Sequence, residues 1–149
     1  MILFDTGPLV ALCDDRDALH ERALEEVDRL PSAKGIVLSA VLTEACFLLG
    51  TRVLRARLAL LLEKLELGAL PDEQTPAFRA AAFAWLDRYA EHDPDYADAC
   101  LAVAAGRQTF QVWTFDSEFA TTWRRPDGRK ILVAIPMSGI RSRKPVRRR

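Results

Sequence analysis

Short apolar runs alternate along the chain with longer stretches in which apolar residues recur at helical spacing. Runs at residues 2–4, 36–38, 111–115 and 131–135 predict strands, and a run at 67–70 predicts a short edge strand. The helices expected between them begin near Pro8, Asp17, Ser39, Val53, Thr75 and Asp95, and a helical turn is expected at 117–121. Strands that alternate with helices favour a parallel sheet with helices on both faces, so we predict an α/β fold.

Polar residues and glycine mark the expected ends of several helices. Asp17, Ser39 and Asp95 each precede an apolar helical pattern and are predicted to cap the helix that follows. Gly50 is expected to stop the helix that starts at Ser39. That helix is apolar nearly all round, so we expect it to be buried.

The size and composition are those of an ordinary globular domain. The chain has 149 residues, of which 50% are hydrophobic and 28% are charged. No apolar stretch approaches the roughly 20 residues that a membrane span needs, and the early Asp5 argues against a signal peptide. We therefore expect a cytoplasmic protein without a membrane segment. Cys13, Cys46 and Cys100 lie far apart in apolar surroundings and are expected to be reduced core thiols.

The net charge of zero hides a basic C-terminus. Residues 141–149 hold six of the 21 basic residues and no acid, so the rest of the chain carries 15 basic against 21 acidic residues. We predict one domain over residues 1–137 and a basic tail over 138–149. Such a tail is typical of a segment that binds nucleic acid or an acidic partner. The alternative is a solvated chain end that binds nothing.

Four carboxylates stand alone within stretches that otherwise avoid charge. Asp5, for example, is the only charged residue of the first 13. The four are Asp5, Glu44, Asp98 and Asp116. Taking an ionised carboxylate out of water costs on the order of several kcal/mol unless a partner compensates it. Either distant cations reach each carboxylate, or the four converge on a divalent metal ion.

The expected topology brings these carboxylates to one edge of the sheet. Asp5 and Asp116 each follow a predicted strand, and sites in open α/β sheets form beyond the carboxyl ends of the strands. Asp98 lies in the first turn of its helix, and Glu44 lies about one and a half turns into the Ser39 helix. We therefore expect all four to face a common pocket.

Each carboxylate also has a purely structural alternative. Asp5 is placed to cap the helix at Pro8, and Asp116 to cap the turn at 117–121. Asp98 has the spacing of a capping box with Asp95. For Glu44, which lies mid-helix among apolar neighbours, the alternative is a buried pair with a distant arginine.

Carboxylate oxygens without nearby histidine or cysteine are the ligands that select Mg²⁺ or Mn²⁺. Such ions stabilise charge on phosphoryl oxygens and lower the pKa of a bound water. The reaction expected of this set is phosphodiester hydrolysis. Without a metal the carboxylates would repel one another, and at least one would hold a proton near neutral pH.

The chain resembles the PIN-domain family, and within it the VapC-like ribonuclease toxins of toxin–antitoxin pairs. The similarity is carried, in order, by the segments Ile2-Leu3-Phe4-Asp5-Thr6-Gly7-Pro8-Leu9-Val10-Ala11-Leu12, Thr43-Glu44-Ala45, Tyr96-Ala97-Asp98-Ala99 and Thr114-Phe115-Asp116-Ser117-Glu118-Phe119. It extends over about residues 1–136. It implies a three-layer α/β/α fold with a central parallel sheet of four to five strands.

The resemblance also implies a role for each residue of the set. Asp5 and Asp98 correspond to direct metal ligands, and Asp116 to a further ligand or one that acts through water. Glu44 corresponds to the residue that orients or deprotonates the attacking water. Thr6 and Thr114 correspond to hydroxyls that hold neighbouring carboxylates in place. The resemblance further implies an RNA substrate, a homodimer and a cognate antitoxin.

Other interpretations of the same residues are weaker. Asp5-Thr6-Gly7 also occurs in aspartic proteases, but their fold is all-β, whereas this pattern is largely helical. A haloacid-dehalogenase-type phosphatase would need an acid where Gly7 stands. A PIN nuclease of RNA processing and a PIN-like module that binds without cleaving remain open. Trp123, beside two arginines, is a candidate for stacking on nucleic acid.

Overall fold

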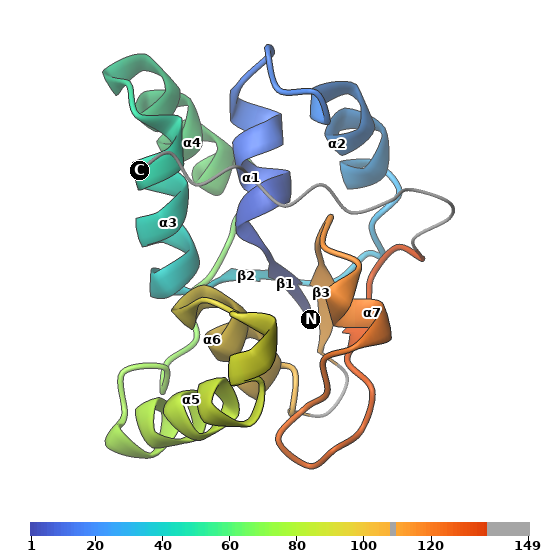
Figure 1. The fold of residues 1–149 in the computed structure, drawn as a ribbon. Helices are drawn as coiled ribbons and strands as arrows, with labels where there is room; N and C mark the ends of the chain where they lie inside the picture. Colours follow the sequence, from blue (N-terminus) through green and yellow to red (C-terminus); the bar gives the residue numbers. More distant parts are fainter. Residues whose placement is uncertain (108–109, 137–149) are drawn as a thin grey trace.

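The computed structural model describes residues 1–107 and 110–136, and at its centre lies a four-stranded parallel sheet (Figure 1). The spatial order is β2-β1-β3-β4. The strands are β1 (Ile2–Phe4), β2 (Gly35–Val37), β3 (Gln111–Trp113) and β4 (Leu132–Val133). The predicted α/β class and parallel sheet are confirmed. The edge strand predicted at 67–70 is reduced to one parallel bridge between Gly68 and Ile36.

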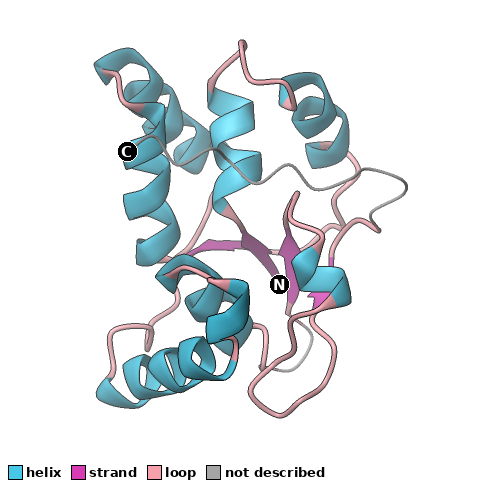
Figure 2. Cartoon of the chain, viewed as in Figure 1, coloured by secondary structure: helices cyan, strands magenta, loops and turns pink. Residues whose placement is uncertain are grey.

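Helices cover the sheet from two sides, as the secondary-structure colours of Figure 2 show. Helices α1 to α4 lie on one side in this view, and α5 and α6 lie together on the other (Figure 1). Their bounds are α1 (Thr6–Cys13), α2 (His20–Val27), α3 (Ser39–Leu49), α4 (Arg52–Lys64), α5 (Pro76–Arg88), α6 (Tyr96–Ala104) and α7 (Glu118–Thr121), with a 3-10 turn at Ala90–His92. This arrangement is the predicted α/β/α layering.

Several predicted helix ends are confirmed in atomic detail. Gly50 takes a left-handed conformation (φ +62°) directly after α3, where glycine bears no Cβ penalty. The Thr75 hydroxyl accepts from the Phe78 N–H at the start of α5. Asp95 caps α6 in the same way.

Two predicted caps are wrong. The Asp17 carboxylate accepts from the Leu19 N–H (2.8 Å) in a turn that precedes α2, so that helix begins later than its apolar pattern indicated. Ser39 is the first helical residue of α3 rather than its cap. Its backbone N–H donates to the Glu73 carboxylate (3.0 Å), which satisfies this helix start from another part of the chain.

The core fills both faces of the sheet with apolar side chains. Leu3 and Val112 are fully buried, and Phe4 meets Trp113 edge-to-face with ring centroids 5.2 Å apart. Cys13 and Cys100 are free thiols in the core, as expected, whereas the free thiol Cys46 is only partly buried. Burial raises the pKa of Cys13 and of Cys100 to about 11. In the part of the chain that the structure describes, no helix is long and apolar enough to cross a bilayer. The predicted basic tail, residues 138–149, lies outside the described residues.

Candidate active site

Asp5 lies where the buried strand β1 passes into helix α1. Its backbone N–H donates to the Trp113 carbonyl (3.0 Å), which extends the β1–β3 ladder by one step. Its Oδ1 accepts from the Thr6 N–H (2.6 Å), and its Oδ2 accepts from the Thr114 hydroxyl (2.6 Å). The alternative role as N-cap of α1 is therefore present. The carboxylate is nevertheless tied to the next strand as well, and the residue is only 8% exposed.

Glu44 reaches the same region from the second turn of α3. Its Oε2 accepts from the Thr6 hydroxyl (2.7 Å). Thr6 thus contacts two carboxylates, through its backbone N–H to Asp5 and through its hydroxyl to Glu44. Both hydroxyl contacts implied by the family resemblance, from Thr6 and from Thr114, are found.

Asp98 lies in the first turn of α6, where the predicted capping box is present. Its Oδ2 accepts from the Asp95 N–H (2.9 Å), and Asp95 Oδ1 accepts from the Asp98 N–H (2.9 Å). Helix α6 packs against α5 and α3, which fixes this first turn relative to the sheet edge. The capping role therefore coexists with a position near the other acids.

Asp116 lies three residues beyond the end of β3 and two residues after the buried Thr114. The Asp116 backbone N–H donates to the Thr114 hydroxyl oxygen (2.9 Å), and its Oδ1 accepts from the Glu118 N–H (2.8 Å) at the start of α7. The alternative role at a helix start is again present. The same Thr114 hydroxyl that donates to Asp5 thus fixes the backbone of Asp116.

The pKa of Asp5 reflects both its burial and the acids around it. Burial raises the pKa of Asp5 to about 7, because the ionised form loses its hydration. Hydrogen bonds from Thr114 and Thr6 lower the pKa, whereas the negative charges of Glu44 and Asp116 raise it. Asp5 is consequently poised between its charged and neutral forms near neutral pH.

Asp98 shows the same effect more strongly. Burial raises its pKa to about 9, and the charges of Asp95, Asp5 and Asp116 act in the same direction. Because Asp5 interacts with Glu44 and Asp116, and Asp98 interacts with Asp5 and Asp116, the four predicted acids lie in one neighbourhood. The structure brings them together rather than dispersing them.

The ion pairs between described residues do not include three of the acids. Within residues 1–107 and 110–136, none of the ion pairs involves Asp5, Asp98 or Asp116. In the same residues, no three His, Cys, Asp or Glu side chains already stand close enough together to form a ready-made metal site. The donors do fit a hard divalent ion in their chemistry, since all are carboxylate oxygens, and burial raises the pKa of Asp5 and of Asp98.

Comparison with known proteins agrees with this geometry. The family model described as PIN domain matches residues 2–123, most of the chain. This chain belongs to the PIN-domain family. The solved structure of the Mycobacterium tuberculosis toxin VapC20, described as a Sarcin-Ricin loop cleaving toxin, has the same fold with a TM-score of 0.67. It is 23% identical, and the match covers 85% of this chain and 98% of that one. The search of curated proteins found no match.

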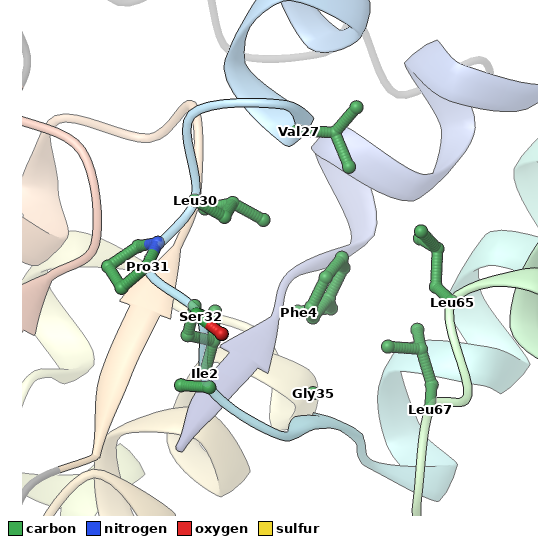
Figure 3. Close-up of a pocket in the computed structure, with 10 residues that line it drawn as sticks. Ile2, Phe4, Val27, Leu30, Pro31, Ser32, Gly35, Leu65 and Leu67 are labelled. Carbon is green, nitrogen blue, oxygen red and sulfur yellow. The ribbon is translucent and has the colours of Figure 1, made fainter.

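In this PIN domain a cavity of about 240 Å³ lies away from the acids. Figure 3 shows that Ile2 and Gly35, the first residues of β1 and β2, line it. Leu30 and Leu67 close it from the segments that follow α2 and α4. Since the acids follow the carboxyl ends of the strands, this cavity belongs to the opposite end of the sheet and takes no part in the acidic site.

Trp123 does not have the role predicted for it. Its side chain is 1% exposed and packs edge-to-face on Trp85 and Phe119, with ring centroids 5.5 and 4.7 Å away. A buried indole cannot stack on nucleic acid. The neighbouring Arg124 uses its guanidinium to donate to the Thr121 carbonyl (3.0 Å).

Sequence reasoning missed one acid near the site. Glu73 accepts from both the backbone N–H and the hydroxyl of Ser39 at the start of α3, the helix that carries Glu44. Its charge also acts on Tyr96 in the first turn of α6. Glu73 lies in the polar stretch Pro71 to Thr75, which differs in no way from an ordinary surface loop, so no sequence signal marked it.

Proposed function

We propose that this PIN domain is a metal-dependent endoribonuclease that hydrolyses RNA phosphodiester bonds. The observation that carries the proposal is the set of Asp5, Glu44, Asp98 and Asp116 in one neighbourhood, with burial and mutual repulsion raising the pKa of two of them. Such a set is costly for stability unless a cation offsets it, and that cost is expected where function requires it. Membership of the PIN-domain family supports the same conclusion.

Asp5, Asp98 and Asp116 are the residues proposed to hold Mg²⁺ or Mn²⁺. When bound, such an ion would stabilise charge on a phosphoryl oxygen and acidify a water. Asp5 is held by Thr6 and Thr114, so its oxygens keep a fixed position at the edge of the sheet. Fixed ligands lose little conformational entropy when a metal binds, which favours binding.

Glu44 is proposed to orient the attacking water or to accept its proton. The Thr6 hydroxyl donates to one of its oxygens, Oε2, and thereby fixes the carboxylate beside Asp5. A base must lie close to the proton that it removes, and a position next to the proposed ligands meets that need. Glu44 is the one acid of the four with no role in starting its own helix.

The likeness to VapC20 supports a toxin of a toxin–antitoxin pair as the more specific proposal. Such a protein would act in the cytoplasm, form a homodimer and bind a cognate antitoxin. Large apolar side chains exposed on α3 and α4 offer a surface for a protein partner. They are Phe47, Leu48, Val53 and Leu60.

The deciding experiment is cleavage of total cellular RNA by the purified protein with added Mg²⁺, with mapping of the new ends. Wild type should cut at a limited set of positions, and Asp5→Asn and chelated wild type should not. Absence of cleavage by wild type under every metal tested would favour a binding module instead. Cleavage without growth arrest on expression, and without a small antitoxin gene beside this one, would favour RNA processing over a toxin.

A further inference from the structure

Helix α2, which packs beside α1 on one side of the sheet (Figure 1), carries a buried ion pair that holds a tryptophan of β3. Glu26 is only 4% exposed, and its carboxylate accepts from Arg22 Nε (2.6 Å) through one oxygen and from Trp113 Nε1 (2.8 Å) through the other. Arg22 lies one turn earlier on α2, whereas Trp113 is the last residue of β3, 87 residues away from Glu26. Both oxygens of this carboxylate are therefore used, and they join α2 to the end of β3.

The same arginine covers a second aromatic ring just beyond that strand. The Arg22 guanidinium carbon lies over the Phe115 ring, 4.6 Å from its centroid, a distance at which a cation is attracted to the face of the ring. Phe115 also meets Trp113 edge-to-face, with centroids 6.1 Å apart. Its third neighbour is the first turn of α1, where a Cβ placed on Gly7 would lie 3.7 Å from Phe115 Cδ2. Phe115 is thus enclosed by α2, by β3 and by the turn that follows Asp5.

These contacts hold the residues that lead to Asp116. Trp113 and Phe115 are held by the ion pair of α2. Thr114, which lies between them, donates to Asp5 and accepts from the Asp116 N–H. Each of residues 113, 114 and 115 therefore has a side-chain contact to another element, and the position of Asp116, the next residue, depends on all three.

A charged acceptor is not needed to bury an indole N–H in this chain. The Trp85 indole donates to the Arg124 backbone carbonyl (2.7 Å), and the buried Trp123 indole has no hydrogen-bond partner among the described residues. A buried ion pair gives little stability beyond that of apolar side chains of the same volume, and its best-attested use is to fix register. Stability alone therefore does not account for Arg22 and Glu26.

We propose that Arg22 and Glu26 are positioning residues, which set the place of residues 113–116 and thereby that of the Asp116 carboxylate relative to Asp5. This inference rests on the ribonuclease function proposed above and adds two residues to its site. Arg22 and Glu26 act through the rings of Trp113 and Phe115 rather than by touching the metal or the RNA. A change in either should therefore weaken metal binding and slow cleavage, and should leave RNA binding unchanged.

The first test measures Mn²⁺ binding to full-length, metal-free protein without RNA, from the electron paramagnetic resonance of the free ion. Arg22→Lys keeps a cation for Glu26 but loses the planar guanidinium over Phe115. Glu26→Gln keeps an acceptor for the Trp113 indole but removes the charge that holds Arg22. Each should weaken Mn²⁺ binding by about 10-fold, the lower end of the range for residues that support a metal ligand. Glu25→Gln, which changes an exposed residue of the same helix, should bind like wild type.

A second readout separates positioning from folding. With Mg²⁺ and RNA, kcat of both variants should fall while KM for RNA stays unchanged, because the pair acts on the reacting site and not on the bound strand. The double variant Arg22→Met with Glu26→Leu leaves no unpaired buried charge, so its melting temperature should equal or exceed that of wild type. It should still lose Mn²⁺ affinity, and it decides the question if either single variant fails to fold.

The outcomes distinguish this proposal from the nuclease function. Variants that melt at a lower temperature but bind Mn²⁺ and cleave RNA like wild type would overturn the positioning role and leave the nuclease intact. Unchanged Mn²⁺ affinity in a folded double variant would overturn it as well. A wild type that binds Mn²⁺ but cleaves no RNA would refute the nuclease, and the comparison of Mn²⁺ affinities would still decide the positioning role. A wild type that binds neither Mn²⁺ nor Mg²⁺ would overturn both.

Discussion

The Thr114 hydroxyl donates a hydrogen bond to Asp5 Oδ2 at 2.6 Å, across the boundary between the ends of β3 and β1. The same oxygen accepts from the Asp116 backbone N–H at 2.9 Å. Thr114 is 3% exposed, so water does not compete for either bond. One buried side chain therefore sets the relative position of two of the proposed ligands, although it is not itself acidic.

Thr114→Val should impair both stability and cleavage. The substitution keeps the shape but removes the donor to Asp5 and the acceptor for Asp116, and each unsatisfied buried polar group costs about 1–3 kcal/mol. The free energy of unfolding, measured in urea, should fall by an amount of this order, and the cleavage rate should fall with it. Thr114→Ser retains the hydroxyl and should recover most of the cleavage. Equal loss in both variants would show that the methyl group, not the hydroxyl, matters.

Asp5→Asn should separate function from folding. Asparagine still accepts from the Thr6 N–H at this helix start, where it is as good a cap as aspartate, and it carries no charge to bury. Cleavage should fall by more than about 100-fold, since loss of residues that only support a metal ligand already costs about 10- to 100-fold. The melting temperature in metal-free buffer at pH 8 should stay equal or rise. The control is Asp28→Asn, an exposed aspartate at the end of α2, and native-rate cleavage by Asp5→Asn would refute its assigned role.

The acids of the site were predictable because each interrupts an apolar pattern. Asp5 is the sole charge in a stretch that the fold buries, so its position follows from pattern and topology. Glu44 is the sole charge of α3, but the prediction that this helix is buried is wrong, because only one face of it, with Val41, Ala45 and Leu49, is buried. The structural alternatives of these acids coexist with their clustering. Asp98, for example, holds its capping box and its place near Asp5 at once, since a carboxylate has lone pairs for both.

Features that depend on packing between distant helices were not predictable. The Phe83–Tyr96 contact exists because α5 lies against α6, and the sequence of neither helix shows which other helix it packs against. Trp123 was predicted to be accessible to nucleic acid but is buried, because two arginines next to it in the sequence carry no information on burial. The start of α3 is likewise completed by Glu73, 34 residues away from Ser39, and helix-cap patterns read only local sequence.

Deletion of residues 141–149 should weaken RNA binding and reduce its dependence on salt. These residues lie outside those that the structure describes, and the prediction follows from their six basic side chains. Each phosphate contact on a single strand contributes about 0.7 to the slope of log K against log salt, so the slope should flatten by up to about 4. A charge-retaining variant with lysine at each arginine of the tail should keep the slope. An unchanged slope after deletion would mean that the tail does not contact RNA.

The stability of the metal-free protein should fall as pH rises, and Mg²⁺ should reverse this. The folded-state pKa values of Asp5 (about 7) and Asp98 (about 9) both lie above the ordinary value of 3.8, because burial favours the neutral acid. The folded protein thus binds more protons than the unfolded chain between these limits, so this contribution is complete below about pH 3.8 and is lost as pH rises through 7 and 9.

Melting temperatures measured with and without Mg²⁺ from pH 5 to pH 9 test this. The gain from Mg²⁺ should be larger at pH 9 than at pH 5, because a cation stabilises only the ionised carboxylates and must displace protons at low pH. The difference between wild type and Asp98→Asn isolates the site from other titrating groups, such as Asp14 and Asp72, whose pKa values are lowered by hydrogen bonds from Arg16 and Arg107. Removal of the Asp98 charge should raise metal-free stability at pH 9 and leave it nearly unchanged at pH 5. A metal-free wild type that gains stability relative to Asp98→Asn as pH rises would contradict the raised pKa, and with it the view that the clustered carboxylates need a cation.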